Sequence, residues 1–321
     1  MSKNILIIGG AGYIGSTAVE KLVSDNHNVT VIDDLSTGQL DKVNSKAIFK
    51  QINILNINDL EEVFINGNFD TVIHFAAKKS VSESEENPDL YFRNNVTGTL
   101  NILSMMNKYQ VSKIIFSSTA AVYKPKDEEN AIYDESSQVE PINIYGKSKL
   151  ICEQLIQEYF RVGKIKEYII FRYFNVAGNS SIKYIEENAQ NVFPLIIKSI
   201  KNNTEFKIFG NDYNTKDGTC IRDYIHLEDL VDAHIVAVNV ENKSGIYNLG
   251  TNTGYSVMDL IETFENILNI KMNIKIDSRR KGDPAVVIAD ASKSKTDLNW
   301  STKRDLRDMI MSMLKAYDII G

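Results

Sequence analysis

Six short apolar runs in the first 175 residues constrain the fold more than any other feature of the sequence. They occur at residues 5–8, 29–33, 47–53, 71–77, 113–118 and 168–174. The runs are rich in Ile, Val and Phe and lack a two-residue alternation, which is typical of strands covered on both faces. Helical patterns separate them, among others at 57–65, 90–109 and 145–161. Strand and helix in alternation predict a parallel, doubly wound sheet of the Rossmann type.

The remainder of the chain mixes helical and strand patterns. Residues 227–239 and 256–268 have the apolar spacing of helices, and 245–250 has that of a strand. The sequence therefore predicts an α/β fold, in which a Rossmann-type doubly wound parallel sheet is joined by a smaller mixed α/β C-terminal domain. The first domain is expected to cover 1–175 with a returning segment at about 222–250, and the second to cover 176–221 and 251–321.

Charge and composition exclude several classes of function. The 321 residues carry a net charge of −6, and the one dense basic stretch, RRK at 279–281, suits a small anionic ligand better than a polymer. Because nucleic acids are bound by clustered Lys and Arg, we expect no nucleic-acid partner. No apolar run approaches the roughly 20 residues of a membrane span, and no cleavable signal is visible. We therefore expect no membrane partner and a cytoplasmic location.

Cysteine and histidine lack the spacing of a metal site. Cys152 and Cys220 form no CxxC pair, and the four histidines show no HExxH or other ligand spacing. Cys152 also falls on the apolar face of the helix expected at 145–161, where a buried thiol is the ordinary outcome. The sequence predicts no metal.

A glycine-rich turn follows the first strand. In ILIIGGAGYIG, Gly9, Gly12 and Gly15 form a GxxGxxG frame that opens a helix, and Gly10 also completes GxGxxG with Gly12 and Gly15. Such glycines permit a tight turn and let the backbone approach a pyrophosphate, which the helix N-terminus attracts. By itself the frame is weak evidence, because a glycine-rich turn without a ligand has the same sequence.

An acidic residue follows at the spacing of a dinucleotide site. Asp33 lies 18 residues after Gly15, close to the roughly 20 at which a carboxylate meets the adenosine ribose. A carboxylate there accepts hydrogen bonds from ribose hydroxyls and repels a 2′-phosphate, so the sequence favours NAD over NADP as cofactor. The alternative for Asp33 is a cap or turn residue.

Tyr145 and Lys149 are one turn apart at the start of a predicted helix, so their side chains share a face. A solvated surface is the common explanation of such a pair. Here it accompanies a dinucleotide frame and FSSTAAVY at 116–123, where a strand ends in three hydroxyl residues. A nearby ammonium and a positive nicotinamide ring favour the phenolate of a Tyr, whose usual pKa is about 10. We therefore expect Tyr145 to remove the proton of a sugar or alcohol hydroxyl.

The sequence resembles the extended short-chain dehydrogenase/reductase family over nearly its whole length. The similarity rests on the segments GGAGYIGS, HFAAKKSVSES, NNVTGTLNIL, FSSTAAVY, YGKSK, FRYFNVAG, IFGNDYNTKDGTCIRDYIH, YNLGT and RRKGDP. Within the family it is similar to the branch of 4-epimerases that interconvert UDP-galactose and UDP-glucose. The resemblance implies an NAD-dependent isomerase that inverts C4 of a UDP-sugar through a transient 4-keto intermediate. The first domain would bind NAD and the second the nucleotide sugar.

The resemblance also implies roles for individual residues. Tyr145 matches the catalytic base, Lys149 its partner, which also binds the nicotinamide ribose, and Thr119 the group that hydrogen-bonds the reacting 4-hydroxyl. The residues implied to line the cofactor are Gly9, Gly12, Tyr13, Ile14, Gly15, Asp33, Asp34, Asn53, Ile54, Phe75, Ala76, Lys79, Asn94, Tyr145, Lys149 and Tyr173, the last beside the nicotinamide. Those implied to hold the UDP-sugar are Thr119, Asn175, Asn191, Arg222, Val287, Arg280 and Asp283, with both arginines on the diphosphate.

Two of these positions depart from the family pattern. Asn53 stands where an Asp commonly contacts the adenine amino group, and its amide oxygen can accept that hydrogen bond without the charge. Val287 occupies a pocket position that is Tyr in enzymes narrow for UDP-glucose and UDP-galactose. We hypothesise that the smaller side chain leaves room for an N-acetyl group, as in UDP-GlcNAc and UDP-GalNAc.

Other interpretations remain open. A 4,6-dehydratase or a decarboxylase of the same fold is one alternative. Dehydratases of this group typically follow the hydroxyl residue with an Asp–Glu pair, whereas Ala120 and Ala121 follow Thr119 here. A non-catalytic NAD-binding sensor is the other alternative, and the intact Tyr145–Lys149 pair argues against it.

Two expectations concern a structural role and assembly. Apart from its motif, Arg222 is equally well explained as an ion-pair partner of Asp223 or Glu228. The resemblance implies a homodimer in which helices at about 90–109 and 145–161 of each subunit pair across a two-fold axis.

Overall fold

The computed structural model describes residues 2–126, 131–186, 189–280 and 282–321. The chain divides into two compact units: residues 1–124, 137–173 and 231–247 form the first, and 125–136, 174–230 and 248–321 form the second. Two boundaries differ from those expected from the sequence. Residues 125–136 belong to the second unit because they carry β6 (Ile132–Tyr133), which pairs with β14 (Val286–Ala289). The returning segment is 231–247, because β10 (Ile221–His226) pairs with β8 (Asn175–Ala177) of the second unit.

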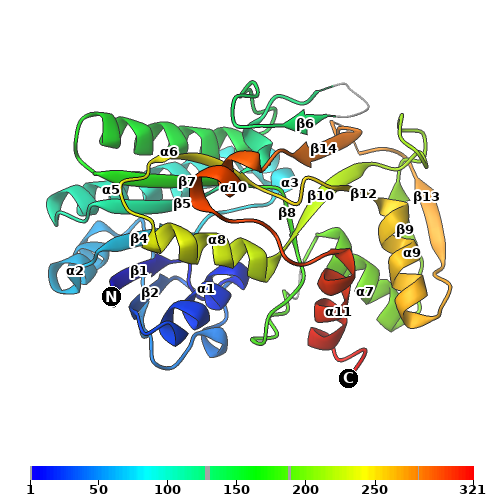
Figure 1. Ribbon diagram of the computed structural model, residues 1–321, viewed down its shortest axis with the longest axis horizontal. Helices are drawn as coiled ribbons and strands as arrows, with labels where there is room; N and C mark the ends of the chain where they lie inside the picture. The colour runs from blue at the N-terminus through cyan, green and yellow to red at the C-terminus, as the bar shows by residue number, and fades with distance from the viewer. Residues whose placement is uncertain (1, 127–130, 187–188, 281) are drawn as a thin grey trace. The chain divides into compact units, whose positions relative to one another are not determined.

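A seven-stranded sheet forms the centre of the first unit, in the order β11-β7-β5-β4-β1-β2-β3 (Figure 1). Its strands are β1 (Asn4–Ile8), β2 (Asn28–Asp33), β3 (Ile48–Gln51), β4 (Thr71–His74), β5 (Lys113–Thr119), β7 (Glu167–Tyr173) and β11 (Gly245–Leu249). All pairs from β7 to β3 are parallel. Six strands coincide with the six apolar runs, so the predicted Rossmann-type sheet is confirmed. The strand order reverses between β1 and β4, the switch point at which such sheets bind ligands.

Helices cover both faces of this sheet (Figure 1). On one face, apolar side chains of α2 (Ile57–Gly67), α5 (Gly98–Lys108) and α6 (Ile144–Arg161) form one cluster with strand residues such as Leu6 and Ile8. On the other face lie α1 (Tyr13–Ser24) and the first-unit part of α8 (Leu227–Asn239), joined by an ion pair of 2.5 Å between Lys21 and Asp232. Ile7, between Leu6 and Ile8, is also fully buried. Burial on both faces explains why the central strands β1, β4 and β5 show no alternation. The same expectation is wrong for the edge strand β3, whose side chains are mostly exposed.

The helix expected over 90–109 is present but has an irregular centre. α4 (Pro88–Tyr91), a π-helical stretch η2 (Phe92–Thr97) and α5 follow one another without a gap. π-Helical turns are rare and are found frequently at functional sites. The helices predicted at 57–65 and 145–161 are confirmed as α2 and α6. The remaining short elements of this unit are η1 (Leu40–Lys42), α3 (Val81–Glu86) and η3 (Ala120–Val122).

In its described residues, the second unit combines two small sheets with the helices α7, α9, α10 and α11. One sheet has the order β12-β10-β14-β6 with β8 paired to β10, and β9 and β13 form a separate parallel pair. The elements not yet given are α7 (Val192–Asn202), β9 (Phe206–Phe209), β12 (Gly254–Ser256), α9 (Val257–Leu268), β13 (Ile274–Asp277), α10 (Ser292–Leu298) and α11 (Leu306–Ala316). Phe193, Phe264 and Met309 from α7, α9 and α11 share one apolar core. Capping boxes at Ser256 and Asp305 begin α9 and α11.

Candidate active site

The glycine turn between β1 and α1 is packed tightly at two of its three positions. Gly9 has φ +84°, and a Cβ there would lie 2.6 Å from the backbone nitrogen of Ala76. A Cβ at Gly15 would lie 2.1 Å from the carbonyl oxygen of Gly9. Glycine is therefore required at both positions by the fold itself.

Gly12 is different, because nothing within the protein requires a glycine there. Its φ of −81° is open to any residue, and an added Cβ would meet only the Gly9 carbonyl oxygen, at 3.4 Å. Gly12 is the N-cap of α1 and provides no side-chain cap. The helix N-terminus is thus left uncovered, with backbone N–H groups that suit an anion. Close approach of a ligand phosphate explains this glycine, and the turn fits the pyrophosphate of a dinucleotide.

Asp33, at the end of β2, is tied to the same turn. Its Oδ2 accepts a hydrogen bond from Ala11 N at 3.0 Å, and its Oδ1 accepts one from Leu35 N at 2.9 Å. Partial burial raises the pKa of Asp33, and these two backbone hydrogen bonds oppose that rise. A carboxylate offers about four acceptor positions, so two remain for ribose hydroxyls. The turn-residue role and the ribose role are therefore compatible.

Asn53 lies beside Asp34, the residue that follows Asp33. Asn53 Nδ2 donates to Asp34 Oδ2 at 3.1 Å, and Asn53 Oδ1 accepts from Leu55 N at 2.9 Å. The amide oxygen expected to accept from adenine therefore already has one donor, and one further lone pair remains.

Tyr145 and Thr119 meet at the carboxyl end of β5. The phenol of Tyr145, on the first turn of α6, hydrogen-bonds with the Thr119 hydroxyl. The pair thus forms a short relay of two hydroxyl groups at the edge of the sheet where the strands end.

In the protein alone, burial has the largest effect on the phenol of Tyr145. Burial raises the pKa of Tyr145, and the hydrogen bond from Thr119 opposes the rise only in part. Lys149 Nζ lies over the Phe116 ring, 4.6 Å from its centroid. That Lys149 together with a bound nicotinamide ring favours the phenolate stays a prediction.

Lys149 is a buried cation that fits a cofactor. Its side chain is 3% exposed, and burial lowers its pKa to about 8, against the opposing effects of Cys152 and Glu153. Within the described part of the chain, the Phe116 ring is the one polar or ring contact of its Nζ. An ammonium has three N–H donors, and ribose hydroxyls of a dinucleotide would supply acceptors for them.

Tyr173 lies deeper than a direct ligand contact would suggest. Its hydroxyl hydrogen-bonds with Ser117 Oγ at 2.7 Å and with His234 Nε2 at 2.5 Å, and burial raises its pKa. Phe75, directly after β4, packs on the other side of His234, with ring centroids 4.9 Å apart. Two of the predicted cofactor residues are therefore joined through a histidine to which sequence reasoning gave no role.

Asn95 is a buried, hydrogen-bonded side chain to which the sequence analysis gave no role. It is 2% exposed and lies in η2. Its Oδ1 accepts from Lys78 N at 2.9 Å and from Asn94 Nδ2 at 2.9 Å, while its Nδ2 donates to Lys78 O at 3.1 Å and to Ser148 Oγ at 2.9 Å. It thus fixes the loop that carries Lys79 to α6. An amide within an otherwise apolar helical pattern was the available signal.

The other first-unit residues vary in exposure. Tyr13, Ile14, Asp34, Phe75, Ala76 and Asn94 are partly buried or exposed, and Lys79 is exposed. Ile54 is 6% exposed and belongs to the apolar cluster, where a Cβ on Gly98 would lie 2.3 Å from its Cδ1. Ile54 therefore serves the core through its side chain, and only its backbone is available to a ligand.

In the second unit, Arg222 is held by neighbours other than those weighed from the sequence. Its guanidinium pairs with Asp283 and donates to the carbonyl oxygens of Ile221 at 2.7 Å and Pro284 at 2.8 Å. The alternative partners are both occupied elsewhere: Asp223 accepts from backbone groups, and Glu228 pairs with Arg304 at 2.7 Å. The proposed structural pairing with either of them is wrong.

Of the other predicted sugar-binding residues in this unit, Asp283 and Val287 lie beside Arg222. Val287 of β14 is directly opposite Arg222 in the strand register, and Asn175 of β8 donates to Asp223 O at 3.1 Å. Arg280 lies over the Phe209 ring, 4.2 Å from its centroid. Asn191 is the N-cap of α7, yet its side chain makes no capping hydrogen bond and is exposed. Lys281 of the basic stretch lies outside the described residues.

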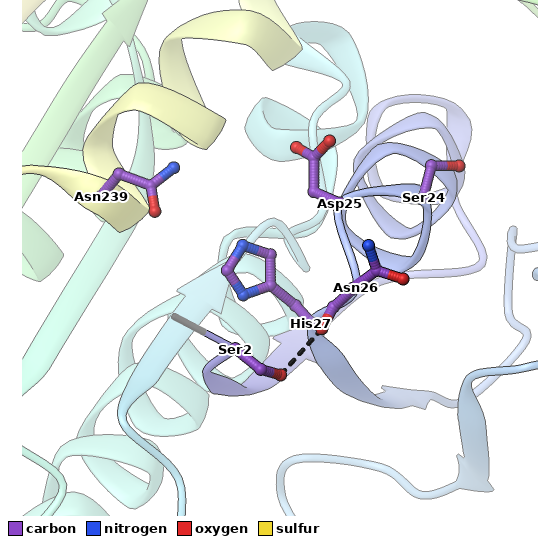
Figure 2. Close-up of a pocket in the computed structure, with 6 residues that line it drawn as sticks. All are labelled: Ser2, Ser24, Asp25, Asn26, His27 and Asn239. Atoms are coloured by element: carbon purple, nitrogen blue, oxygen red, sulfur yellow. Dashed lines mark hydrogen bonds between the residues drawn. The ribbon is translucent and has the colours of Figure 1, made fainter.

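A shallow pocket in the first unit is lined by none of the predicted site residues (Figure 2). It is lined by Ser2, Ser24, Asp25, Asn26, His27 and Asn239. These residues adjoin the amino ends of β1 and β2, whereas ligands of parallel sheets bind at the carboxyl ends. Among the described residues, no group of three or more His, Cys, Asp or Glu side chains could hold a metal ion, and no helix is long and apolar enough to cross a membrane.

This chain matches a known protein family and is similar to a curated relative over nearly its whole length. Residues 5–250 match the NAD dependent epimerase/dehydratase family. The UDP-glucose 4-epimerase of Lactobacillus helveticus is 40% identical over 316 residues, which cover 96% of this chain and 94% of the relative.

Two solved structures extend the likeness to the whole fold. The UDP-glucose 4-epimerase of Stenotrophomonas maltophila, with bound NAD and formylated UDP-arabinopyranose, has a TM-score of 0.93 and 33% identity, covering 99% of this chain and 98% of that one. The UDP-Glc/GlcNAc 4-epimerase of Campylobacter jejuni has a TM-score of 0.86 and 34% identity, covering 100% of both chains.

Proposed function

The chain belongs to the NAD-dependent epimerase/dehydratase family, and we propose that it interconverts UDP-galactose and UDP-glucose by inverting C4 of the sugar through a transient 4-keto intermediate. The observation that carries the proposal is the Tyr145 phenol, hydrogen-bonded to Thr119 one helical turn from the buried ammonium of Lys149. A base, a hydroxyl partner and a cation are the groups that removal of a proton from a sugar hydroxyl requires.

The first unit offers the groups that would hold NAD. The uncovered α1 N-terminus at Gly12 suits the pyrophosphate, and Asp33 has acceptor positions left for the adenosine ribose. The carboxylate would repel a 2′-phosphate, which supports NAD over NADP. Lys149 would donate to the nicotinamide ribose. When bound, NAD supplies an acceptor for the hydride on C4 and a positive ring that favours a nearby phenolate.

Tyr145 would carry the proton in both directions. Its phenolate takes the proton of the 4-hydroxyl, relayed or oriented by Thr119, as C4 is oxidised to the ketone. The same phenol returns the proton after the keto sugar presents its other face, so the base is regenerated. Since burial raises the pKa of Tyr145 in the protein alone, the positive charges around it must supply the opposing effect.

The second unit offers donors for the nucleotide diphosphate. Arg222 and Arg280 would contact its oxygens, and the guanidinium of Arg222 is already fixed in place by Asp283. Asn175 and Asn191 are exposed amides that can hydrogen-bond sugar or base groups. We assign Thr119, Asn175, Asn191, Arg222, Arg280, Asp283 and Val287 to UDP-sugar binding.

Val287 supports a wider range of sugars. It is partly exposed and lies opposite Arg222, where a larger side chain would fill more space. The Campylobacter jejuni structure is that of a UDP-Glc/GlcNAc 4-epimerase, so the fold accommodates N-acetylated substrates in at least one relative. Negligible turnover of UDP-GlcNAc beside brisk turnover of UDP-galactose would refute this extension.

The dehydratase alternative lacks its acid and base. Ala120 and Ala121 follow Thr119, and neither side chain can supply a proton. A non-catalytic sensor would not need the hydrogen bond between Thr119 and Tyr145.

A single assay separates the epimerase hypothesis from the dehydratase and sensor hypotheses. Purified protein incubated with UDP-galactose, without added NAD, is expected to form UDP-glucose, because the cofactor is regenerated in each cycle and stays bound. Tyr145→Phe should lower kcat by about 10³-fold while bound NAD is unchanged, since only the proton carrier is lost. Tyr159→Phe on the same helix is the matched control and should retain activity. Unimpaired turnover by Tyr145→Phe would contradict the assignment.

We further propose a cytoplasmic homodimer that serves galactose metabolism. The dimer is supported by exposed apolar side chains on the expected helices: Leu90 of α4 and Leu100 of α5 are each 39% exposed, and Phe160 of α6 is 38% exposed. Exposed apolar side chains on all three of these helices suit a self-complementary surface.

A further inference from the structure

A buried ion pair lies near the predicted reacting groups. Arg172 Nε donates to Glu153 Oε1 at 3.0 Å, and Arg172 Nη2 donates to Glu153 Oε2 at 2.6 Å. Glu153 is 1% exposed and Arg172 is 3% exposed. Ser118 Oγ also donates to Glu153 Oε1 at 2.5 Å, and the Arg172 guanidinium lies over the Tyr123 ring, 4.8 Å from its centroid.

Core stability is a weak explanation for this pair. Removing two charges from water costs free energy that their attraction often fails to return, and apolar side chains of similar volume can fill such a space as well or better. Within the described residues, Arg172 Nη1 is also buried without a hydrogen-bond partner, which adds to the cost. A reason beyond packing is needed.

The pair joins the ends of the two strands that carry site residues. Ser118 precedes Thr119 in β5, and Arg172 precedes Tyr173 in β7. The strand register places Ser118 opposite Arg172 and Thr119 opposite Tyr173. In each strand, the residue that precedes the site residue therefore donates to the carboxylate of Glu153.

The same carboxylate belongs to the helix that carries the base. Glu153 follows Lys149 by one turn of α6, so the two side chains lie on one face. The titratable and ring groups around the ammonium are Glu153 and Cys152 from α6, His74 from β4 and Phe116 from β5. Among these, Glu153 is the carboxylate that raises the pKa of Lys149, whereas burial raises the pKa of the Cys152 thiol to about 11.

We propose that the Glu153–Arg172 pair positions the reacting groups of the epimerase, by fixing the ends of β5 and β7 against α6. The inference rests on the proposed function. Neither side chain needs to touch substrate or cofactor: the pair sets where the Thr119 hydroxyl and the Lys149 ammonium lie relative to the phenol of Tyr145. Loss of the pair should therefore affect turnover more than substrate binding.

Two changes test the proposal. Glu153→Gln keeps the shape and removes the charge, and a double variant, Glu153→Leu with Arg172→Met, removes both charges and should fold because no ion is left unpaired. Both are expected to lower kcat by roughly 10- to 100-fold, the effect of a small misplacement of reacting groups, with KM and bound NAD close to those of the unmodified chain.

The pH profile distinguishes positioning from general damage. Burial lowers the pKa of Lys149 to about 8, and Glu153 raises it. Without that carboxylate the ammonium loses its proton at lower pH, so the upper limb of the kcat profile should move to lower pH in Glu153→Gln. Asp229→Asn is the matched control, because Asp229 is also 1% exposed and paired with an arginine, Arg304, but lies in the second unit. Asp229→Asn should leave the upper limb of the kcat profile at the same pH as in the unmodified chain.

The outcomes separate this inference from the proposed function. An unmodified chain that fails to convert UDP-galactose would overturn the function. An active unmodified chain together with a folded double variant whose kcat is within twofold would overturn the positioning role alone.

Discussion

At the scale of single residues, Gly12 makes the cofactor site testable without disturbing the fold. An added Cβ has ordinary contact distances at Gly12 but would lie 2.1 Å from a backbone oxygen at Gly15. Gly12→Ala should therefore keep the melting temperature within a few degrees yet bind NAD at least ~10-fold more weakly, a loss of about 1.4 kcal/mol, because the methyl group occupies the phosphate's space. NAD titration and thermal unfolding measure the two effects.

Gly15→Ala serves as the contrasting variant. It should lower the melting temperature, since the backbone must shift to relieve the clash with Gly9. Gly12→Ala with unchanged NAD affinity would show that the α1 N-terminus does not hold the pyrophosphate.

The sequence predicted which residues form the candidate site better than it predicted how deeply their side chains are buried. Spacing alone identified Gly9, Gly12, Gly15 and Asp33, because backbone conformation and close approach restrict residue types locally. The sequence did not indicate that burial raises the pKa of Tyr145 in the protein alone, because burial is a property of the packed chain and leaves no mark on the Tyr–Lys spacing.

At the scale of elements, Asp223 joins three segments of the second unit. Its carboxylate on β10 accepts from Thr251 N and Thr251 Oγ1 at 2.8 Å each, from Asn252 N at 3.0 Å and from Ala289 N of β14 at 3.2 Å. Asp223→Ala would leave these buried donors without an acceptor, so it should lower the free energy of unfolding by about 3 kcal/mol or more. Urea unfolding measures the change.

A surface carboxylate provides the comparison. Asp277 is paired with Lys207 at 3.8 Å and its side chain is 42% exposed, so Asp277→Ala should cost less than about 1 kcal/mol. Equal losses in the two variants would show that the hydrogen bonds of Asp223 contribute little.

Strands and helices of the first unit were predicted closely, while the links between them were not. The apolar runs identified β1, β4, β5 and β7 because these strands are almost completely buried. β3, at the edge of the sheet, was found although most of its side chains are exposed. The π-helical centre at 92–97 depends on Asn95 bonding to Lys78, a contact 17 residues away in sequence. Neither periodicity nor propensity reports a long-range contact of this kind.

At the scale of the whole molecule, the exposed apolar residues of α4, α5 and α6 predict assembly. We expect the chain to elute at twice its mass of 36.2 kDa in gel filtration. Leu100→Glu should shift it toward a monomer, because a two-fold interface places a substituted residue on both partners and a charge buried there is costly. Ile270→Glu, at a 37% exposed position in the second unit, should leave the dimer intact. A monomeric unmodified chain would contradict the assembly.

The two hydrogen bonds of Asp33 to Ala11 and Leu35 have a practical consequence for coenzyme engineering. The carboxylate that we propose for NAD preference also accepts two hydrogen bonds from the backbone of the turn. Asp33→Ser alone, intended to admit NADP, would also remove the acceptors of these two hydrogen bonds. A change of coenzyme therefore requires new acceptors for the N–H groups of Ala11 and Leu35 as well as space for the 2′-phosphate.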